Sequence, residues 1–139
     1  MILLDTNVVS EPLKVGGGDP KMIAWLDRQS IETLYLSTFT VSEILFGIAV
    51  MDAGRRRDDL RRRVMEEVFP QFAGRILGFD ESAAREGATL RAAARAAGRP
   101  IPDTDSFIAA VAMSRGLALA TRNTKHFGAT GLQLINPWD

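Results

Sequence analysis

The 139-residue sequence contains no cysteine and only one histidine, His126. The absence of cysteine excludes disulfides, thiolate–zinc sites and cysteine nucleophiles. A single histidine excludes multi-histidine metal sites, and a Ser–His–Asp arrangement would have to use His126 without a G-x-S-x-G motif to support it. Net charge is lacking as well, because 17 basic and 17 acidic residues cancel. Proteins that read duplex DNA usually carry a basic excess, so that role is not favoured.

Long hydrophobic runs are also missing. No run approaches the ~18–20 apolar residues that a membrane helix needs, and the first residues lack the basic and apolar regions of a signal peptide. We therefore expect a cytoplasmic protein with no membrane partner. Hydrophobic residues make up 46% and charged residues 24% of the chain, as is typical of globular proteins. The length, with no repeat or long linker, predicts a single domain over residues 1–139.

Short apolar runs alternate with helical patterns along the chain. Strands separated by helices imply βαβ crossovers and a parallel sheet that is covered on both faces. We therefore predict an α/β fold, namely a three-layer α/β/α sandwich with a mainly parallel sheet of about five strands. The expected strands are 2–4, 33–37, 76–79, 117–121 and 132–135, and the expected helices are about 20–29, 40–54, 55–68, 80–98 and 104–115.

The first apolar run, Ile2–Leu4, ends in Asp5, Thr6 and Asn7. Buried parallel strands read as continuous apolar runs, and such sheets bind ligands just beyond the carboxyl ends of their strands. A carboxylate at that edge, with a hydroxyl and an amide beside it, suits a hard cation such as Mg²⁺. We therefore expect Asp5 to lie at the edge of an active site.

Two further acids, Glu43 and Asp105, lie on apolar stripes of expected helices. An ionised carboxylate on a buried face is unfavourable unless it is paired or binds a metal. Together with Asp5, these acids come from three distant segments and predict one metal site. Their stripe neighbours, at helical spacing, are Phe46, Gly47 and Val50 for Glu43, and Ile108, Ala109 and Ala112 for Asp105.

Each acid also has a purely structural explanation. Thr40-x-x-Glu43 has the spacing of a capping box, in which Glu43 would bond amides at the helix start. Asp105 lies in a first helical turn, where the helix dipole favours acids, and Asp103 beside it is expected to be the N-cap. Asp5 alone would suit a turn.

Four short motifs, in order along the chain, resemble the PIN-domain family, especially the VapC-type toxins of bacterial toxin–antitoxin pairs. The resemblance implies a PIN-like fold and an Mg²⁺- or Mn²⁺-dependent ribonuclease that cleaves single-stranded regions of RNA. It also implies a homodimer silenced by a small antitoxin from the same operon, with DNA bound only through that antitoxin. The motifs are 1–12 (MILLDTNVVSEP), 38–47 (TFTVSEILFG), 105–110 (DSFIAA) and 120–127 (ATRNTKHF), and the ending 135–138 (INPW) is typical of one branch.

By position, the resemblance gives Asp5, Glu43 and Asp105 the family's acidic roles, both catalytic and metal-binding. Thr6 and Asn7 would tune that site. With carboxylates but no histidine pair or thiol, the natural chemistry is metal-assisted phosphodiester hydrolysis. We expect Asp5 and Asp105 to hold the cation, with Glu43 binding it directly or through water.

The fourth family position departs from the pattern. Members often carry Asp at the position of Asn123 or of His126, and this chain has neither. Asn123 is therefore the candidate for the fourth catalytic position, and its neutral amide would hold a second metal only weakly. Thr121 is expected at the end of the fourth strand, and His126 at the surface or in support of a metal ligand.

Two other features keep alternatives open. The runs 55–57 and 61–63 are arginines that flank Asp58 and Asp59; we interpret them as a solvated helix face, with an RNA or antitoxin contact as the alternative. Asp80 follows an expected third strand, as the phosphoacceptor of a receiver-like signalling domain would. Against this interpretation, the sequence lacks the acidic pair that a receiver domain carries after its first strand. A non-catalytic binding module is the remaining alternative, supported by the missing fourth acid.

Overall fold

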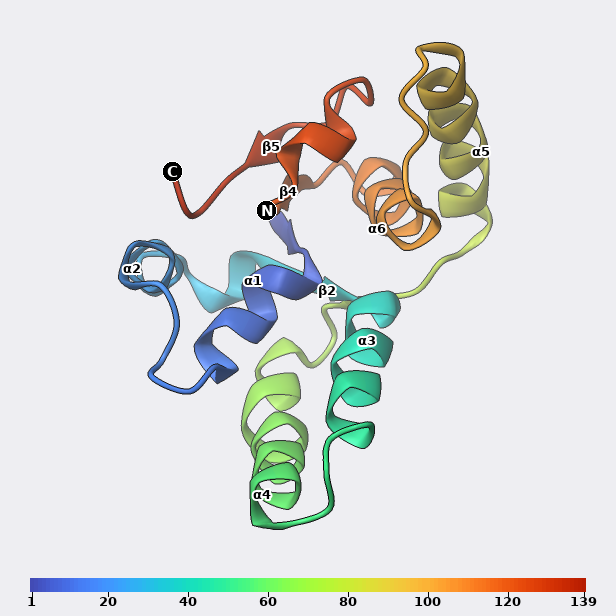
Figure 1. The fold of residues 1–139 in the computed structure, drawn as a ribbon. Coiled ribbons are helices and arrows are strands. Elements are labelled where there is room, and N and C mark those ends of the chain that lie inside the picture. The colour runs from blue at the N-terminus through green and yellow to red at the C-terminus, as the bar shows by residue number, and fades with distance from the viewer.

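A five-stranded parallel sheet runs through the computed structural model, which describes all of residues 1–139. The strand order is β3-β2-β1-β4-β5, and all four neighbouring pairs are parallel. Figure 1 shows helices on both faces of this sheet, so the predicted three-layer α/β/α fold is confirmed. The strands are β1 (Ile2–Leu4), β2 (Leu34–Ser37), β3 (Ile76–Leu77), β4 (Ala118–Ala120) and β5 (Leu134–Ile135).

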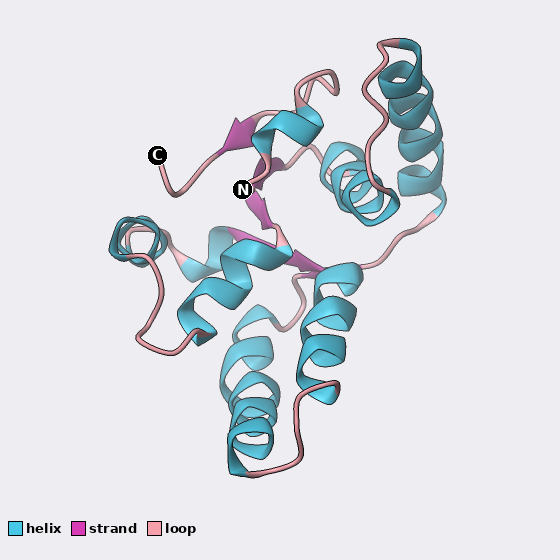
Figure 2. Cartoon of the chain, viewed as in Figure 1, coloured by secondary structure: helices cyan, strands magenta, loops and turns pink.

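Six α-helices connect and cover the strands (Figure 2). One expected helix, 55–68, is regular only to Arg63 and continues as a π-helical turn over Val64–Val68. Pro70 follows closely and cannot continue a regular helix, because it has no amide hydrogen. The helices are α1 (Thr6–Ser10), α2 (Pro20–Asp27), α3 (Thr38–Ala49), α4 (Arg55–Arg63), α5 (Glu81–Ala96) and α6 (Asp103–Ser114). None of them has the length and apolar character needed to cross a membrane.

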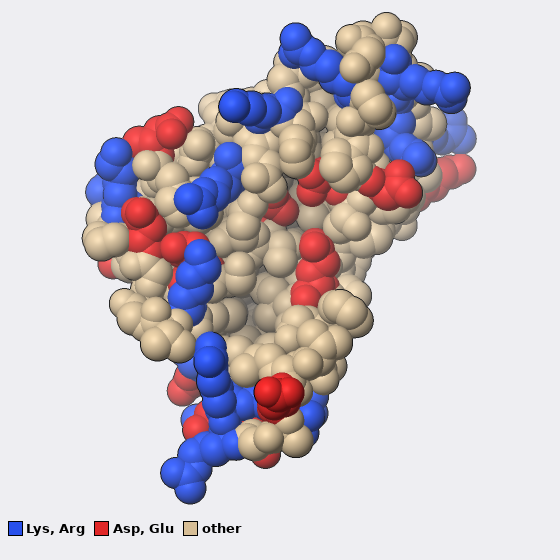
Figure 3. Space-filling view, viewed as in Figure 1, with Lys and Arg blue, Asp and Glu red and all other residues tan.

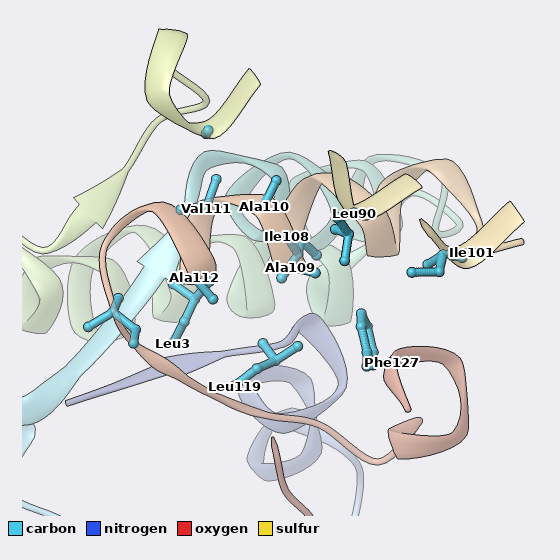
Figure 4. Close-up of a cluster of buried hydrophobic side chains, with 13 residues drawn as sticks. Leu3, Leu90, Ile101, Ile108, Ala109, Ala110, Val111, Ala112, Leu119 and Phe127 are labelled. Atoms are coloured by element: carbon cyan, nitrogen blue, oxygen red, sulfur yellow. The ribbon is translucent and has the colours of Figure 1, made fainter. Parts of the chain in front are cut away.

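The two faces of the sheet carry separate apolar cores. Successive residues of a strand point to opposite faces, so Leu3 packs with α5 and α6 whereas Leu4 packs with the helices of the other layer. Figure 4 shows the first core, in which Leu3 and Leu119 meet Ile108 and Phe127. The second core takes its helical residues from α1, α2 and α3 and from the Val64–Val68 turn.

The strand register brings distant segments to one edge. β1 is central, and Leu3 is aligned with Tyr35 of β2 while Leu4 is aligned with Ala120 of β4. The chain leaves these three parallel strands at Asp5, at the start of α3 and at Thr121. The polar residues that follow the strands therefore gather at the carboxyl edge of the sheet, as expected for this topology.

Candidate active site

Asp5 lies directly after β1 and is only 4% exposed. It is also the N-cap of α1. One carboxylate oxygen accepts the backbone N–H of Thr6 (2.8 Å), and the other accepts the hydroxyl of Thr121 (2.7 Å) and the amide of Asn7 (3.4 Å). No basic side chain forms an ion pair with it. Hydrogen bonds therefore hold the carboxylate in place but leave its charge uncompensated.

The electrostatics of Asp5 reflect this position. Burial raises the pKa of Asp5, and the negative charges of Asp105 and Glu43 raise it further. The hydrogen bonds from Thr121 and Thr6 oppose this rise without cancelling it. Asp105 and Glu43 are thus close enough to repel Asp5, and a cation at this edge would relieve that repulsion.

Glu43 reaches the edge from α3. The helix begins at Thr38 and its N-cap is Ser37, whose hydroxyl accepts the N–H of Thr40 (3.1 Å), so the capping-box interpretation of Glu43 is wrong. One carboxylate oxygen of Glu43 instead accepts the hydroxyl of Thr6 (2.7 Å), which also lies 3.1 Å from the hydroxyl of Thr40. The hydroxyl of Thr6 therefore connects Glu43 to the start of α1, next to Asp5.

The stripe on which Glu43 lies is apolar, as expected, but it is not buried. Phe46 is 69% exposed and Val50 is 64% exposed. α3 buries Ile44 and Ile48 instead, together with Thr40. Nearly every face of α3 carries apolar residues, so periodicity alone did not identify the face that meets the sheet. Glu43 lies at the exposed flank of this helix.

The stripe on which Asp105 lies is buried, as predicted. Its stripe neighbours on α6 are at most 1% exposed, while its own side chain is 19% exposed. One carboxylate oxygen lies 2.7 Å from Nδ1 of His126. Asp103 is not the N-cap, because α6 begins at Asp103 and follows Pro102. Asp103 pairs instead with Arg91 of α5, at 3.2 Å.

The catalytic role expected of Asn123 at the fourth position stays a prediction. Asn123 contributes its backbone N–H, which donates to the hydroxyl of Thr121 (3.0 Å), and it lies at the surface. The side chain that meets an acid is that of His126, on the short turn Thr124–Phe127. The position of Thr121 just after β4 is confirmed, but its hydroxyl bond to Asp5 was not foreseen. A hydroxyl residue at the end of a buried strand was the available signal.

The three acids converge on one edge without forming a ready-made cage. No group of three His, Asp or Glu side chains in the chain is arranged to hold one metal ion. Mg²⁺ nevertheless suits these donors, because it keeps several waters and commonly binds through one or two carboxylates. The buried, unpaired carboxylate of Asp5 fits that role. Figure 3 shows acidic side chains around a hollow between the parts of the surface that α3 and α6 occupy.

Asp80 and the arginines of α4 have structural partners. Asp80 is the N-cap of α5, accepts the N–H of Ala83 (2.9 Å) and pairs with Arg115 (3.4 Å). These contacts give its carboxylate a capping role, which disfavours the receiver-like alternative. On α4, Arg57 lies 3.8 Å from Asp58, which fits a partly self-neutralised surface.

Comparison with known proteins agrees with this geometry. The PIN domain family profile matches residues 2–131. The chain is 50% identical over 139 residues to the VapC ribonuclease Y4jK of Sinorhizobium fredii and 48% identical to the plasmid stability protein StbB of Pseudomonas syringae pv. tomato, covering 100% of this chain and 99% of each relative. The crystal structure of FitAcB from Neisseria gonorrhoeae matches with a TM-score of 0.95 and 43% identity over 99% of both chains. The structure of FitAB bound to an IR36 DNA fragment matches with a TM-score of 0.97 and 42% identity, covering 100% of this chain and 96% of that chain.

Proposed function

Because this chain belongs to the PIN domain family, we propose that it is an endoribonuclease toxin of a type II toxin–antitoxin pair. Its substrate would be single-stranded regions of RNA, and residues 1–139 would act as one domain. The observation that carries the proposal is the buried Asp5 carboxylate, whose pKa is raised by burial and by the charges of Asp105 and Glu43. A relative named as a VapC ribonuclease, 50% identical over the whole chain, supports the same activity.

We further propose that the reaction uses Mg²⁺, with Mn²⁺ as a substitute. Asp5 and Asp105 would hold the cation, and Glu43 would contact it directly or through water. When bound, such a cation lowers the pKa of water and offsets negative charge on a phosphate. This chain's own residues supply the positioning: Thr121 fixes one oxygen of Asp5, and the Thr6 hydroxyl holds one oxygen of Glu43.

The experiment that tests this proposal compares three reactions on one single-stranded RNA. Purified protein is incubated in Mg²⁺, in EDTA and, in Mg²⁺, as the variant Asp5→Ala. We expect cleavage only in the first. Binding of Mn²⁺, followed by electron paramagnetic resonance, gives a second readout that needs no turnover, and it should weaken in Asp5→Asn. Equal cleavage in all three reactions would remove the metal mechanism.

We also propose a small antitoxin from the same operon as the partner. The FitAB and FitAcB structures are complexes of a relative, which supports such an assembly. On this chain, an apolar groove of about 370 Å³ runs between α3 and α4 and is lined by Gly47, Met51 and Leu60 as well as by Glu43 and Thr6. A partner helix in this groove would block access to Glu43.

Two properties of the assembly follow as proposals. The protein would form a homodimer, and it would contact DNA only through its antitoxin. Sedimentation velocity of the purified chain tests the first, because a dimer should persist without the antitoxin. Gel-shift assays with operator DNA test the second: the toxin alone should leave the DNA unshifted, whereas the complex with the product of the adjacent small gene should shift it.

A further inference from the structure

Three arginines follow one another at four-residue intervals at the end of α5 and in the loop after it: Arg91, Arg95 and Arg99. We refer to them as the α5 arginine patch. No acidic residue lies between them in the sequence. Residues four apart lie on one face of a helix, so Arg91 and Arg95 are neighbours on the surface of α5. Figure 3 shows basic side chains gathered over the region of α5, at the upper right of the view.

The patch borders a shallow hollow of about 710 Å³ between the end of α5 and the start of α6. Arg91 and Arg95 supply its positive charge, and the Arg91 side chain is 51% exposed. The other lining residues are small or apolar apart from one acid, so the floor leaves room for an extended ligand. They are Ala92, Ala96, Pro100, Ile101 and Asp103.

The hollow adjoins the candidate active site through the first turn of α6. The Arg91 guanidinium lies 3.2 Å from Asp103 and 5.8 Å from the centre of the Phe107 ring. Asp103 and Phe107 stand two residues before and two residues after Asp105. Helical residues two apart face opposite sides, so Asp105 lies on the other side of this turn, and a chain molecule in the hollow would have to pass around the start of α6 to reach the carboxyl edge of the sheet.

A structural explanation covers only part of this patch. Positive charge in the last turn of a helix interacts favourably with the helix dipole, which accounts for Arg95, and the ion pair with Asp103 accounts for Arg91. Arg95 and Arg99 form no ion pair anywhere in the chain. Like charges four residues apart repel each other in a helix. Arg91 is paired with Asp103, so the excess positive charge of the patch is that of Arg95 and Arg99.

The arginines of α4 differ in having acidic residues among them in the sequence. Asp58 and Asp59 interrupt them, and Glu66 and Glu67 follow in the adjoining turn. Arg62 lies 4.0 Å from Glu66. Their charge is therefore partly compensated within the helix, which makes α4 a matched control surface for α5.

We propose that the α5 arginine patch binds backbone phosphates of single-stranded RNA beside the acidic edge; this inference rests on the proposed ribonuclease function. An acidic site repels a polyanion, and neighbouring cations that release counterions from the nucleic acid offset that repulsion. Arginine is suited to the task because its planar guanidinium binds a phosphate through two hydrogen bonds. The patch would hold the strand on one side of the cleavage point and so govern binding more than chemistry.

The test measures RNA binding without turnover. Fluorescence anisotropy follows a labelled oligouridylate of about 12 nucleotides, a length within the range of single-strand sites, in EDTA over a series of salt concentrations. Compared with wild type, Arg91→Gln/Arg95→Gln should raise the Kd by roughly 3- to 30-fold, the range for two exposed charge contacts. The slope of log K against log salt should become shallower by about 1.4, since each single-strand phosphate contact contributes about 0.7.

The control variant is Arg55→Gln/Arg62→Gln, which removes the same charge from exposed positions of α4. It should change the Kd and the salt slope little. Asp103→Asn removes the acid that pairs with Arg91 and should tighten RNA binding. An unchanged Kd for the α5 variant overturns the inference, and so does an equal loss in the α4 control. If the α5 variant loses binding of an oligoglutamate peptide but keeps RNA, the patch serves an acidic protein segment and the proposal is wrong.

Failure of the proposed function gives a different result. If the wild type does not cleave RNA in Mg²⁺ but the α5 variant still binds RNA more weakly than the α4 control, the binding site stands and the ribonuclease proposal fails. If the wild type cleaves, the α5 variant should show a raised KM with little change in kcat. A lowered kcat at unchanged KM would assign these arginines to the chemical step and overturn the inference.

Discussion

Replacement of Thr121 by valine tests the hydrogen bond that fixes Asp5. Thr121 is fully buried, and its hydroxyl donates to the Asp5 carboxylate at 2.7 Å. Hydrogen bonds to charged groups contribute about 1.5–3 kcal/mol, so Thr121→Val should destabilise the metal-free protein by about 2 kcal/mol. For a chain of this size that loss lowers Tm by roughly 6–10 °C. Because this bond lowers the pKa of Asp5, the variant's pKa should rise further, and the acid limb of activity should move to higher pH.

Two variants separate this bond from packing and from hydroxyl loss in general. Thr121→Ser keeps the hydroxyl and removes one buried methyl group, at a cost of about 1 kcal/mol. Thr40→Val removes an equally buried hydroxyl whose partners are the neutral hydroxyls of Thr6 and Ser37, at a cost of about 0.5–1.5 kcal/mol. Urea denaturation in EDTA at neutral pH gives the free energies of unfolding, with the m-value as a check on two-state behaviour.

The decisive comparison is a double-mutant cycle with Asp5→Asn, which removes the charge that the hydroxyl serves. The cost of Thr121→Val should fall by about 1 kcal/mol in that background, because a neutral hydrogen bond is weaker than a charge-assisted one. The reasoning is refuted if Thr121→Val is as stable as Thr121→Ser, or if its cost is the same with Asn at position 5.

Three further predictions concern the site and the helix packing. In EDTA, Asp5→Asn should be more stable than wild type at neutral pH and nearly equal to it in acid. Because the pKa of Asp5 is raised on folding, the stability that its protonated form contributes is present below the unfolded pKa and is lost as pH rises through the folded pKa. Measurements of Tm for both proteins across that pH range test this. His126→Ala should weaken Mn²⁺ binding by roughly 10- to 100-fold. His126→Asn should retain most of the binding, because its amide nitrogen can take the place of Nδ1 beside Asp105. Equal losses in the two variants would mean that the contact at 2.7 Å does not position Asp105. A Cβ added at Gly87 of α5 would lie 3.1 Å from the Cβ of Ala110 of α6, so Gly87→Ala should destabilise the protein by about 1 kcal/mol. Gly47→Ala, on the open side of α3, should instead stabilise it by about 0.5–1 kcal/mol. Urea midpoints measure both changes, and a stabilised Gly87→Ala variant would contradict the close packing of α5 and α6.

The fold was largely predictable because its signals are local. Each strand is a short apolar run after a turn, and each helix has a cap or an apolar period that a sequence displays directly. The same logic worked for the stripe of Asp105, because α6 is buried on nearly every side from Ile108 to Ala112, so an apolar stripe there is buried whichever face it lies on. It failed in part for Glu43, because α3 is apolar on several faces and only the packed structure shows that Phe46 and Val50 remain exposed.

The contacts within the site were harder to predict because they join residues far apart in the chain. The bond from Thr121 to Asp5 spans 116 positions, and the contact between His126 and Asp105 depends on how the Thr124–Phe127 turn packs on α6. The family resemblance pointed to Asn123 for the fourth position. Only the path of the chain after β4 shows that His126 reaches an acid instead.

The central place of β1 in the sheet has a consequence for biosynthesis. Asp5 leaves the ribosome more than a hundred residues before β4, the strand that completes its surroundings. At about 5–20 residues per second, several seconds separate these two events. During that interval the nascent chain holds the carboxylate without the hydroxyl that fixes it, so the acidic edge takes its final shape only after β4 and Thr121 have emerged.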